Sequence, residues 1–212
     1  MLKSGQKTKK ENSYMRILLA TSERELLNAY QLILTDEYGD VTTAFDGAIA
    51  MALIDEQNFD IAILDARLPR VDYKIIAEKL CEKNIPSVVM VYSKIERTDF
   101  AKDIPAAEYL SFPFFPEEMK AALNKVWNIR NSDKTVRIGK YEIKENEFKF
   151  SGLHITAGEI EVLEALEKGD YLMQEGHSTH MNLLNSKFSK LNSGLKITYD
   201  FGKGYKLVNQ ND

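Results

Sequence analysis

Cysteine is nearly absent from this sequence of 212 residues, and tryptophan and histidine are scarce: one Cys, one Trp and three His. A single cysteine, Cys81, excludes a disulfide framework and any metal site built from a cluster of cysteines. No apolar run approaches the ~20 residues that a bilayer-spanning helix needs, so we expect no membrane association. The first 13 residues are polar and basic without an apolar stretch, which argues against a signal peptide. The sequence therefore favours a reduced, cytoplasmic protein.

Charge is unevenly distributed along the chain, although the net charge is only −4. Residues 14–126 carry 12 basic and 19 acidic residues, or −7, whereas residues 177–212 carry 5 and 2, or +3. Clustered positive charge at a surface favours an anionic partner. A solvated lysine surface without a partner is the alternative that charge alone leaves open.

The N-terminal half alternates short apolar runs with amphipathic segments. We expect strands at 16–20, 41–44, 61–64, 88–92 and 109–110, and helices at 23–38, 46–54, 75–83, 95–103 and 116–129. The apolar strands are continuous rather than alternating, which is typical of a parallel sheet covered on both faces. With right-handed crossovers this is a doubly wound α/β sheet, whose ligand-binding edge lies at the carboxyl ends of the strands.

Two segments resemble landmarks of response-regulator receiver domains. The run FDIAILDARLPRVD, from Phe59 to Asp72, is similar to the phosphoacceptor segment of that family, with Asp65 at the acceptor position. The run YLSFPF, from Tyr109 to Phe114, is similar to the family's Tyr-Leu-x-Lys-Pro-Phe, in which the lysine binds the phosphoryl group and the proline is cis. The resemblance covers about residues 15–128 and implies a flavodoxin-like, five-stranded receiver.

The residues that would assist phosphorylation in that family are replaced here. Phosphoryl transfer to a carboxylate needs Mg²⁺ held by hard oxygen ligands. The family supplies an acidic pair after the first strand, where this chain has Thr21 and Ser22. The fourth-strand hydroxyl falls on Val91, unless the register slips to Ser93, and the phosphate-binding lysine falls on Phe112.

Asp65 therefore occupies the acceptor position of a degenerate site. We expect a pseudo-receiver that stays in one state, with no catalytic residues and with Mg²⁺ binding at Asp65 disfavoured. Regulated phosphorylation by a cognate histidine kinase is likewise not expected. A single aspartate at a strand end is also typical of a helix cap or a turn, and this interpretation stays open.

The C-terminal half has a different pattern. Residues 136–143 and 147–150 alternate apolar and polar side chains, as half-buried antiparallel strands do. Thr156 and Glu159 form a capping-box pair at the start of a helix over 155–166, and a second amphipathic helix covers 179–191. Residues 197–207 contain the sequence Gly-Lys-Gly-Tyr. This order resembles the winged-helix domain of OmpR/PhoB-type regulators, with a recognition helix at 179–191 and a wing at 197–207.

The resemblance implies double-stranded DNA as a partner. A winged helix places its recognition helix in the major groove, while the wing reaches the neighbouring backbone or minor groove. Asparagine suits adenine edges and lysine neutralises phosphates. The candidate DNA-binding residues are Asn182, Asn185, Ser186, Lys187, Ser189, Lys190, Lys196, Lys203 and Lys206.

Two departures from the family predict weak DNA affinity unless dimerisation multiplies it. Only 12 residues separate Leu166 from Thr179, so the helix that normally lies between these two is missing or cut to a stub. The recognition helix lacks arginine, and Phe201 stands where the wing of the family tends to carry one. A polar helix face that is simply hydrated is the alternative interpretation.

The family also implies a symmetric dimer through the receiver face formed by the fourth helix, fifth strand and fifth helix. Mixed charges on one patch suit self-complementary pairing. The candidates on this face are Arg97, Lys102, Asp103, Glu108, Glu118, Lys120 and Lys125. We expect a basic flexible tail at 1–14, a receiver-like domain at 15–130, a linker at 131–135, a winged-helix-like effector domain at 136–208 and a tail at 209–212.

Two functions follow from these patterns. The first is a non-enzymatic, phosphorylation-independent DNA-binding transcriptional response regulator that acts as a homodimer. The alternative is a protein-interaction module derived from such a regulator that no longer binds DNA. His177 and His180 have a spacing that permits a shared metal, but we interpret them as polar residues at a helix start and expect no metal site. Cys81 is expected to be a small buried side chain.

Overall fold

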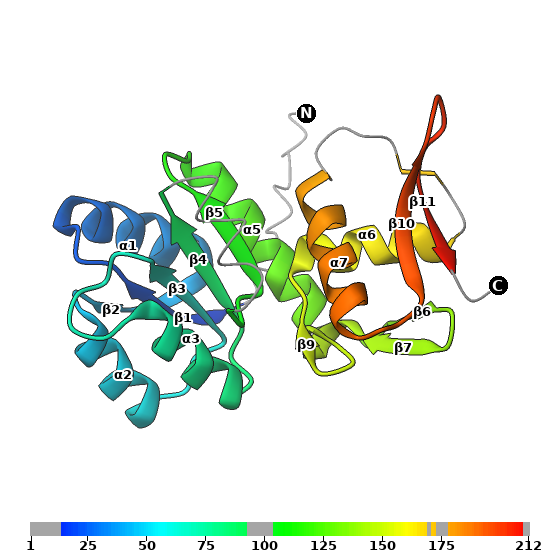
Figure 1. The fold of residues 1–212 in the computed structure, drawn as a ribbon. Coiled ribbons are helices and arrows are strands. Elements are labelled where there is room, and N and C mark those ends of the chain that lie inside the picture. The colour runs from blue at the N-terminus through cyan, green and yellow to red at the C-terminus, as the bar shows by residue number, and fades with distance from the viewer. Residues whose placement is uncertain (1–13, 93–103, 169–170, 173–177, 210–212) are drawn as a thin grey trace, which may run out of the picture.

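The computed structural model describes residues 14–92, 104–168, 171–172 and 178–209. Figure 1 shows an N-terminal α/β unit, coloured blue to green, beside a smaller C-terminal unit, coloured yellow to red. Within the described ranges, no helix is long and apolar enough to cross a membrane.

Five parallel strands form the sheet of the N-terminal unit in the order β2-β1-β3-β4-β5. The strands are β1 (Met15–Ala20), β2 (Gly39–Ala44), β3 (Ile61–Asp65), β4 (Ser87–Val91) and β5 (Glu108–Ser111). Every residue of β3 and β4 is buried, because helices cover both faces of the sheet. The expected flavodoxin-like architecture is confirmed.

Helices α1 (Arg24–Tyr38), α2 (Gly47–Glu56), α3 (Tyr73–Glu82) and α5 (Pro116–Arg130) flank this sheet. Side-chain caps fix where several of them begin. The Asp72 carboxylate accepts a hydrogen bond from the Lys74 amide at 2.9 Å, so α3 starts two residues earlier than expected. Glu118 accepts from the Phe115 amide at 2.7 Å at the start of α5. The helix expected at 95–103 lies outside the described residues.

In its described residues, the C-terminal unit contains three antiparallel hairpins, two α-helices and one short 3₁₀ helix. Its elements are β6 (Thr135–Ile138), β7 (Tyr141–Lys144), the short 3₁₀ helix η1 (Glu145–Glu147), β8 (Lys149–Phe150), β9 (Leu153–His154), α6 (Ala157–Glu167), α7 (Ser178–Lys190), β10 (Leu195–Asp200) and β11 (Gly204–Asn209). The segment 136–143, expected as one strand, turns back at Gly139, whose positive φ of 57° suits glycine. The capping box of Thr156 and Glu159 is confirmed.

Aromatic and aliphatic side chains from both units form one continuous apolar cluster. Phe150 and Phe188 meet edge to face at 5.5 Å in the C-terminal unit. The same cluster includes Leu123 and Val126 of α5, in the N-terminal unit. The backbone amide of Ala157 also donates to the carbonyl of Ala107 at 2.7 Å. The two units therefore share a packed interface.

The connection between α6 and α7 is short. Leu172, in this connection, exchanges two backbone hydrogen bonds with Tyr205 of β11, at 2.9 and 2.8 Å. The structure describes residues 168 and 171–172 of this connection, so the expectation of a missing or stub-like helix stays a prediction. The wing hairpin of β10 and β11 thus packs against an extended segment.

Candidate functional site

Asp65 lies at the carboxyl end of the central strand β3 and is fully buried. The Thr21 hydroxyl, after β1, donates to Asp65 Oδ2 at 2.7 Å, and the Tyr92 hydroxyl, after β4, donates to the same oxygen at 2.9 Å. The backbone amide of Arg67 donates to Oδ1 at 2.8 Å. Both carboxylate oxygens are therefore engaged by groups of this chain.

A stack of side chains covers this carboxylate. The Arg67 guanidinium lies 3.6 Å from the centre of the Tyr92 ring, and the Phe112 ring lies 5.2 Å from the Tyr92 ring. Phe112 in turn meets Phe114 edge to face at 5.7 Å. Burial, together with the bond to Asp65, raises the pKa of Tyr92, so its hydroxyl remains a protonated donor at neutral pH. The peptide bond between Phe112 and Pro113 is cis, as the resemblance implied.

The residues around Asp65 do not fit Mg²⁺, the ion that the family implies. Magnesium binding needs several free oxygen ligands in octahedral geometry, usually with more than one negative charge. Thr21 is neutral and its hydroxyl is already bonded to Asp65. Ser22 and Glu23 have exposed side chains. Among the residues that the structure describes, no group of three His, Cys, Asp or Glu is placed to hold a metal ion.

Two expectations for this edge need correction. Val91 is the buried last residue of β4, and the hydroxyl that reaches Asp65 comes from the next residue, Tyr92. Ser93, the alternative, lies outside the described residues. Asp65 does hold a turn through the Arg67 amide, but it has no exposure, unlike an ordinary turn or cap residue. A hydroxyl on a longer side chain directly after the fourth strand was the available signal for Tyr92.

The outward face of α7 presents an uncharged polar stripe. Ser178, Asn182 and Ser189 are exposed, and Ser186 is half-buried beside them. Lys190, at the end of the helix, is also exposed. This stripe keeps most of the predicted recognition residues accessible, with little positive charge on the helix itself.

Lys187 is not available to DNA, which corrects the expectation for this residue. Its Nζ lies 2.7 Å from both carboxylate oxygens of Glu159 on α6, and its side chain is 5% exposed. Burial raises the pKa of Glu159 and lowers that of Lys187, while the attraction between the two charges opposes both shifts. The pair joins α6 to α7 inside the C-terminal unit.

Asn185 also has a structural role in place of the expected base contact. Its side-chain amide donates to the carbonyl of Ile197 at 3.0 Å and accepts from the Ile197 amide at 2.7 Å. These two bonds attach α7 to β10. Leu183, which the sequence did not single out, is buried in the same apolar cluster as Ile104 and Ala106 of the N-terminal unit. An apolar side chain on the otherwise polar face of the helix was the signal for this contact.

The wing carries the remaining candidate lysines. Lys196 and Lys203 are exposed, and Lys206 is half-buried. Lys206 Nζ lies 3.5 Å from Asp200 Oδ2, and the Tyr171 hydroxyl donates to the same oxygen at 3.0 Å. The Tyr171 hydrogen bond and the nearby lysines lower the pKa of Asp200. The wing therefore presents net positive charge beside the α7 stripe.

The expected dimer face is partly consumed inside the molecule. Glu108 is buried and pairs with Lys125 at 3.2 Å, and Lys125 also reaches Glu161 of α6 at 2.8 Å. These two residues hold the C-terminal unit on α5, which corrects their assignment to a free surface. Lys120 pairs with Glu37 of α1 at 3.1 Å, and Glu118 caps α5. The other candidates, Arg97, Lys102 and Asp103, lie outside the described residues.

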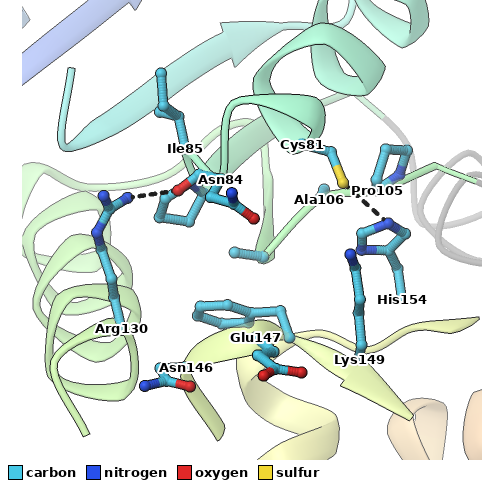
Figure 2. A pocket seen from close by; sticks show the side chains of 13 residues that line it. Cys81, Asn84, Ile85, Pro105, Ala106, Arg130, Asn146, Glu147, Lys149 and His154 are labelled. Atoms are coloured by element: carbon cyan, nitrogen blue, oxygen red, sulfur yellow. Dashed lines mark hydrogen bonds between the residues drawn. The ribbon is translucent and has the colours of Figure 1, made fainter. Parts of the chain in front are cut away.

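A small cavity of about 50 Å³ lies where the two units meet (Figure 2). Cys81 Sγ lies 3.1 Å from His154 Nε2, and Arg130 donates to the backbone carbonyl of Asn84 at 3.0 Å. Burial raises the pKa of the Cys81 thiol and lowers that of His154, because it disfavours the charged form of both groups. Cys81 thus lies half-buried at the junction rather than within the core.

Of the two histidines whose spacing would permit a shared metal, His177 lies outside the described residues. His180 lies on α7, and its ring packs so closely on α6 that a Cβ at Gly158 would collide with it. This close packing gives His180 a place in the contact between the two helices.

The fold agrees with comparisons to known proteins. Residues 17–124 match the family model of the response regulator receiver domain, so the chain belongs to the response regulator receiver family. The response regulator ArlR of Staphylococcus aureus strain Mu50 is 25% identical over 162 residues, which cover 76% of this chain and 73% of the relative.

Solved structures show the same architecture over nearly the whole chain. A mutant of RitR superposes with a TM-score of 0.62 at 20% identity, covering 92% of this chain and 99% of that one. DrrB, an OmpR/PhoB homologue of Thermotoga maritima, gives a TM-score of 0.54 at 18% identity with the same coverage. The resemblance to OmpR/PhoB-type response regulators is therefore confirmed at the level of the fold.

Proposed function

We propose that this response regulator is a DNA-binding transcriptional regulator that works without phosphorylation. The observation that carries the proposal is the closed state of Asp65, whose two oxygens accept three hydrogen bonds beneath an aromatic stack. An incoming phosphodonor needs an exposed carboxylate oxygen, a metal ion and a cation for the transferred group. Here Asp65 has no exposure, Thr21 and Ser22 stand where the acidic metal ligands would be, and Phe112 supplies no charge at the lysine position.

The DNA-binding part of the proposal is supported by the accessible stripe on α7 and by the wing. Asn182 suits an adenine edge in the major groove, and Ser186 and Ser189 suit bases or phosphates. Once Lys187 is excluded, four of the candidate DNA-binding lysines remain to neutralise phosphates: Lys190, Lys196, Lys203 and Lys206. Four such cations predict binding that is modest and depends strongly on salt.

We further propose that the regulator acts as a cytoplasmic homodimer, with a receiver domain at 15–130 and an effector domain at 136–208. Among the described residues of the expected dimer face, the start of α5 stays exposed. Lys120 contributes charge there, and Phe115 is 74% exposed. A second copy would double the number of lysines that contact one operator.

An electrophoretic shift assay with labelled genomic fragments tests this function. We expect the full chain to shift DNA at 50 mM salt and to lose the complex at 200 mM salt, because about four phosphate contacts per protomer give a steep salt dependence. Asn182→Ala should weaken the shifted complex without changing stability, whereas Asn28→Ala, at an exposed asparagine on α1, should leave it unchanged. No shift at low salt from folded protein would overturn the proposal.

The alternative function, a protein-interaction module, has one observation in its favour. An open groove of about 530 Å³ runs beside α1 and is lined by apolar and aromatic side chains, including Leu26, Ile33 and Phe112. A helix of a partner protein fits such a groove. Absence of DNA binding together with loss of a partner upon Leu26→Asp would favour this alternative.

A further inference from the structure

Phe201 is more exposed than any other large apolar side chain in the described part of the chain. Its side chain is 93% exposed, whereas the next in order, Leu32 and Phe115, are 74% exposed. It lies at the tip of the hairpin of β10 and β11, which extends beyond the rest of the C-terminal unit (Figure 1). Burial of this exposed phenyl ring against a partner would be favourable, because it removes apolar surface from water.

The hairpin beneath Phe201 is braced. The Lys203 amide donates to the Asp200 carbonyl at 3.0 Å, and Gly202 takes the positive φ of 78° that closes the turn. Below the turn, the rings of Tyr199 and Tyr205 meet edge to face at 5.1 Å. The hairpin therefore presents the ring on a preorganised support, so that little ordering is needed when the ring is buried against a partner.

The surroundings of Phe201 favour a nucleic acid over a protein surface. Lys203 is exposed beside it, and Lys196 is exposed further along the hairpin. The nearest acid, Asp200, is occupied by the Tyr171 hydroxyl and by Lys206, so it adds little free negative charge. An apolar ring flanked by cations matches the stacked bases and flanking phosphates of DNA.

We propose that Phe201 inserts between base pairs as an apolar wedge when the wing enters the minor groove. Wedge side chains of this kind unstack one base step and bend the duplex toward the major groove. Pyrimidine–purine steps unstack most easily, so the ligand is a duplex with such a step beneath the wing. Phe201 thus contributes to sequence preference through the ease with which a base step unstacks, and not through contacts with base edges. This inference rests on the proposed DNA binding.

Selection from a random-sequence duplex library by the full wild-type chain, followed by substitution of single base steps, tests the wedge. Selected duplexes should carry a pyrimidine–purine step at a fixed distance from the segment contacted by α7. Replacing that step by an AA step should lower wild-type affinity about tenfold, the size expected for one aromatic–base stack. Energy transfer between dyes at the two ends of the selected duplex should report a bend on binding.

Substitutions of Phe201 test the wedge without changing any charge. Phe201→Ala should lose about tenfold in affinity for the selected duplex and most of the bend, and it should no longer distinguish the two steps. Phe201→Leu should keep part of the bend. Phe45→Ala, which removes a ring that is 59% exposed on the N-terminal unit, is the matched control and should change nothing.

The outcomes are distinct. If Phe201→Ala binds and bends the selected duplex as the wild type does, the wedge is wrong and the proposed DNA binding stands. If the ring is needed for affinity but the duplex stays straight, Phe201 makes a surface contact only and the wedge is again wrong. If the folded wild type selects no duplex, both the wedge and the proposed function fail, and a protein partner for the wing becomes the better explanation.

Discussion

The two units of this molecule each contain a fully buried carboxylate, Asp65 in the receiver and Glu159 in the C-terminal unit, and the two are satisfied in different ways. Among the described residues, Asp65 accepts hydrogen bonds from two hydroxyls and one backbone amide and from no cation. Glu159 in the C-terminal unit is paired with Lys187, a full positive charge, at 2.7 Å. At each site, a side chain that was expected to bind a ligand is bonded within the protein: Asp65 in the receiver and Lys187 in the C-terminal unit. The surface that stays open is the α7 stripe with the wing.

Breaking the charged site should have the largest effect. Lys187→Met leaves Glu159 buried without its cation, and removal of one partner of a buried pair destabilises a protein by about 3–5 kcal/mol. Chemical denaturation measures this change in the free energy of unfolding. Lys190→Met, at an exposed lysine on the same helix, should stay within about 0.5 kcal/mol of the wild type.

The double variant sharpens this prediction. Glu159→Leu with Lys187→Met removes both charges, so it should be much closer to the wild type than either single variant. A single variant as stable as the wild type would show that the pair is not buried and that Lys187 is available to DNA after all.

The next largest effect should be the salt dependence of DNA binding by the α7 stripe and the wing. Four lysines in phosphate contact on each protomer predict a slope of about −3.6 per protomer for log K against log salt, or an affinity loss of about 150-fold per protomer between 50 and 200 mM. Titration of a labelled duplex by fluorescence anisotropy gives the slope. Lys203→Gln should reduce its magnitude by about 0.9. An unchanged slope would remove the wing from the interface.

Weakening the neutral site should have a smaller effect than breaking the charged one. Tyr92→Phe removes one of the hydroxyls on Asp65, and a hydrogen bond to a charged group is worth about 1.5–3 kcal/mol. The free energy of unfolding should fall by this amount. Tyr199→Phe, an exposed tyrosine on the wing, serves as the control and should have little effect. Equal stability of Tyr92→Phe and the wild type would contradict the closed site.

The smallest effect should be on the pH dependence of stability, through His154 at the junction between the two units. Burial lowers the pKa of His154 below its ordinary value of 6.5, so the unfolded chain takes up this proton first as the pH falls. Stability from this group is therefore present at pH 7 and is lost progressively below about pH 6.5. His154→Gln should flatten the stability profile between pH 7 and 5. Identical profiles for the two proteins would contradict the buried, neutral imidazole.

The sequence predicted the receiver well because its signals are local. Continuous apolar runs place β1, β3 and β4, and Asp46 marks the start of α2. The cap at Asp72 was missed, so the start of α3 was placed two residues too late. The identities of Thr21 and Phe112 were enough to predict a degenerate acceptor site. Tyr92 was missed because the expected strand register placed the hydroxyl at Val91 or Ser93, whereas the long side chain of Tyr92, between them, reaches Asp65 from the end of the neighbouring strand.

The recognition surface was predicted less well, since helical periodicity assigns a face but not what covers it. Lys187 and Asn185 lie near the borders of the polar face, and Glu159 and Ile197 bind them from other elements. Leu183 is covered by the receiver, which periodicity within one helix does not reveal. Glu108 and Lys125 were likewise assigned to a free surface that the neighbouring unit occupies.

The central claim is that DNA binding is independent of phosphorylation at Asp65. The most direct measurement is the affinity for one labelled genomic fragment, with the wild type and Asp65→Asn each incubated with Mg²⁺ and a small phosphodonor or with Mg²⁺ alone. We predict that the phosphodonor leaves both affinities unchanged and that no acid-stable label appears on Asp65. An affinity that rises with the phosphodonor in the wild type, and not in Asp65→Asn, would contradict the account.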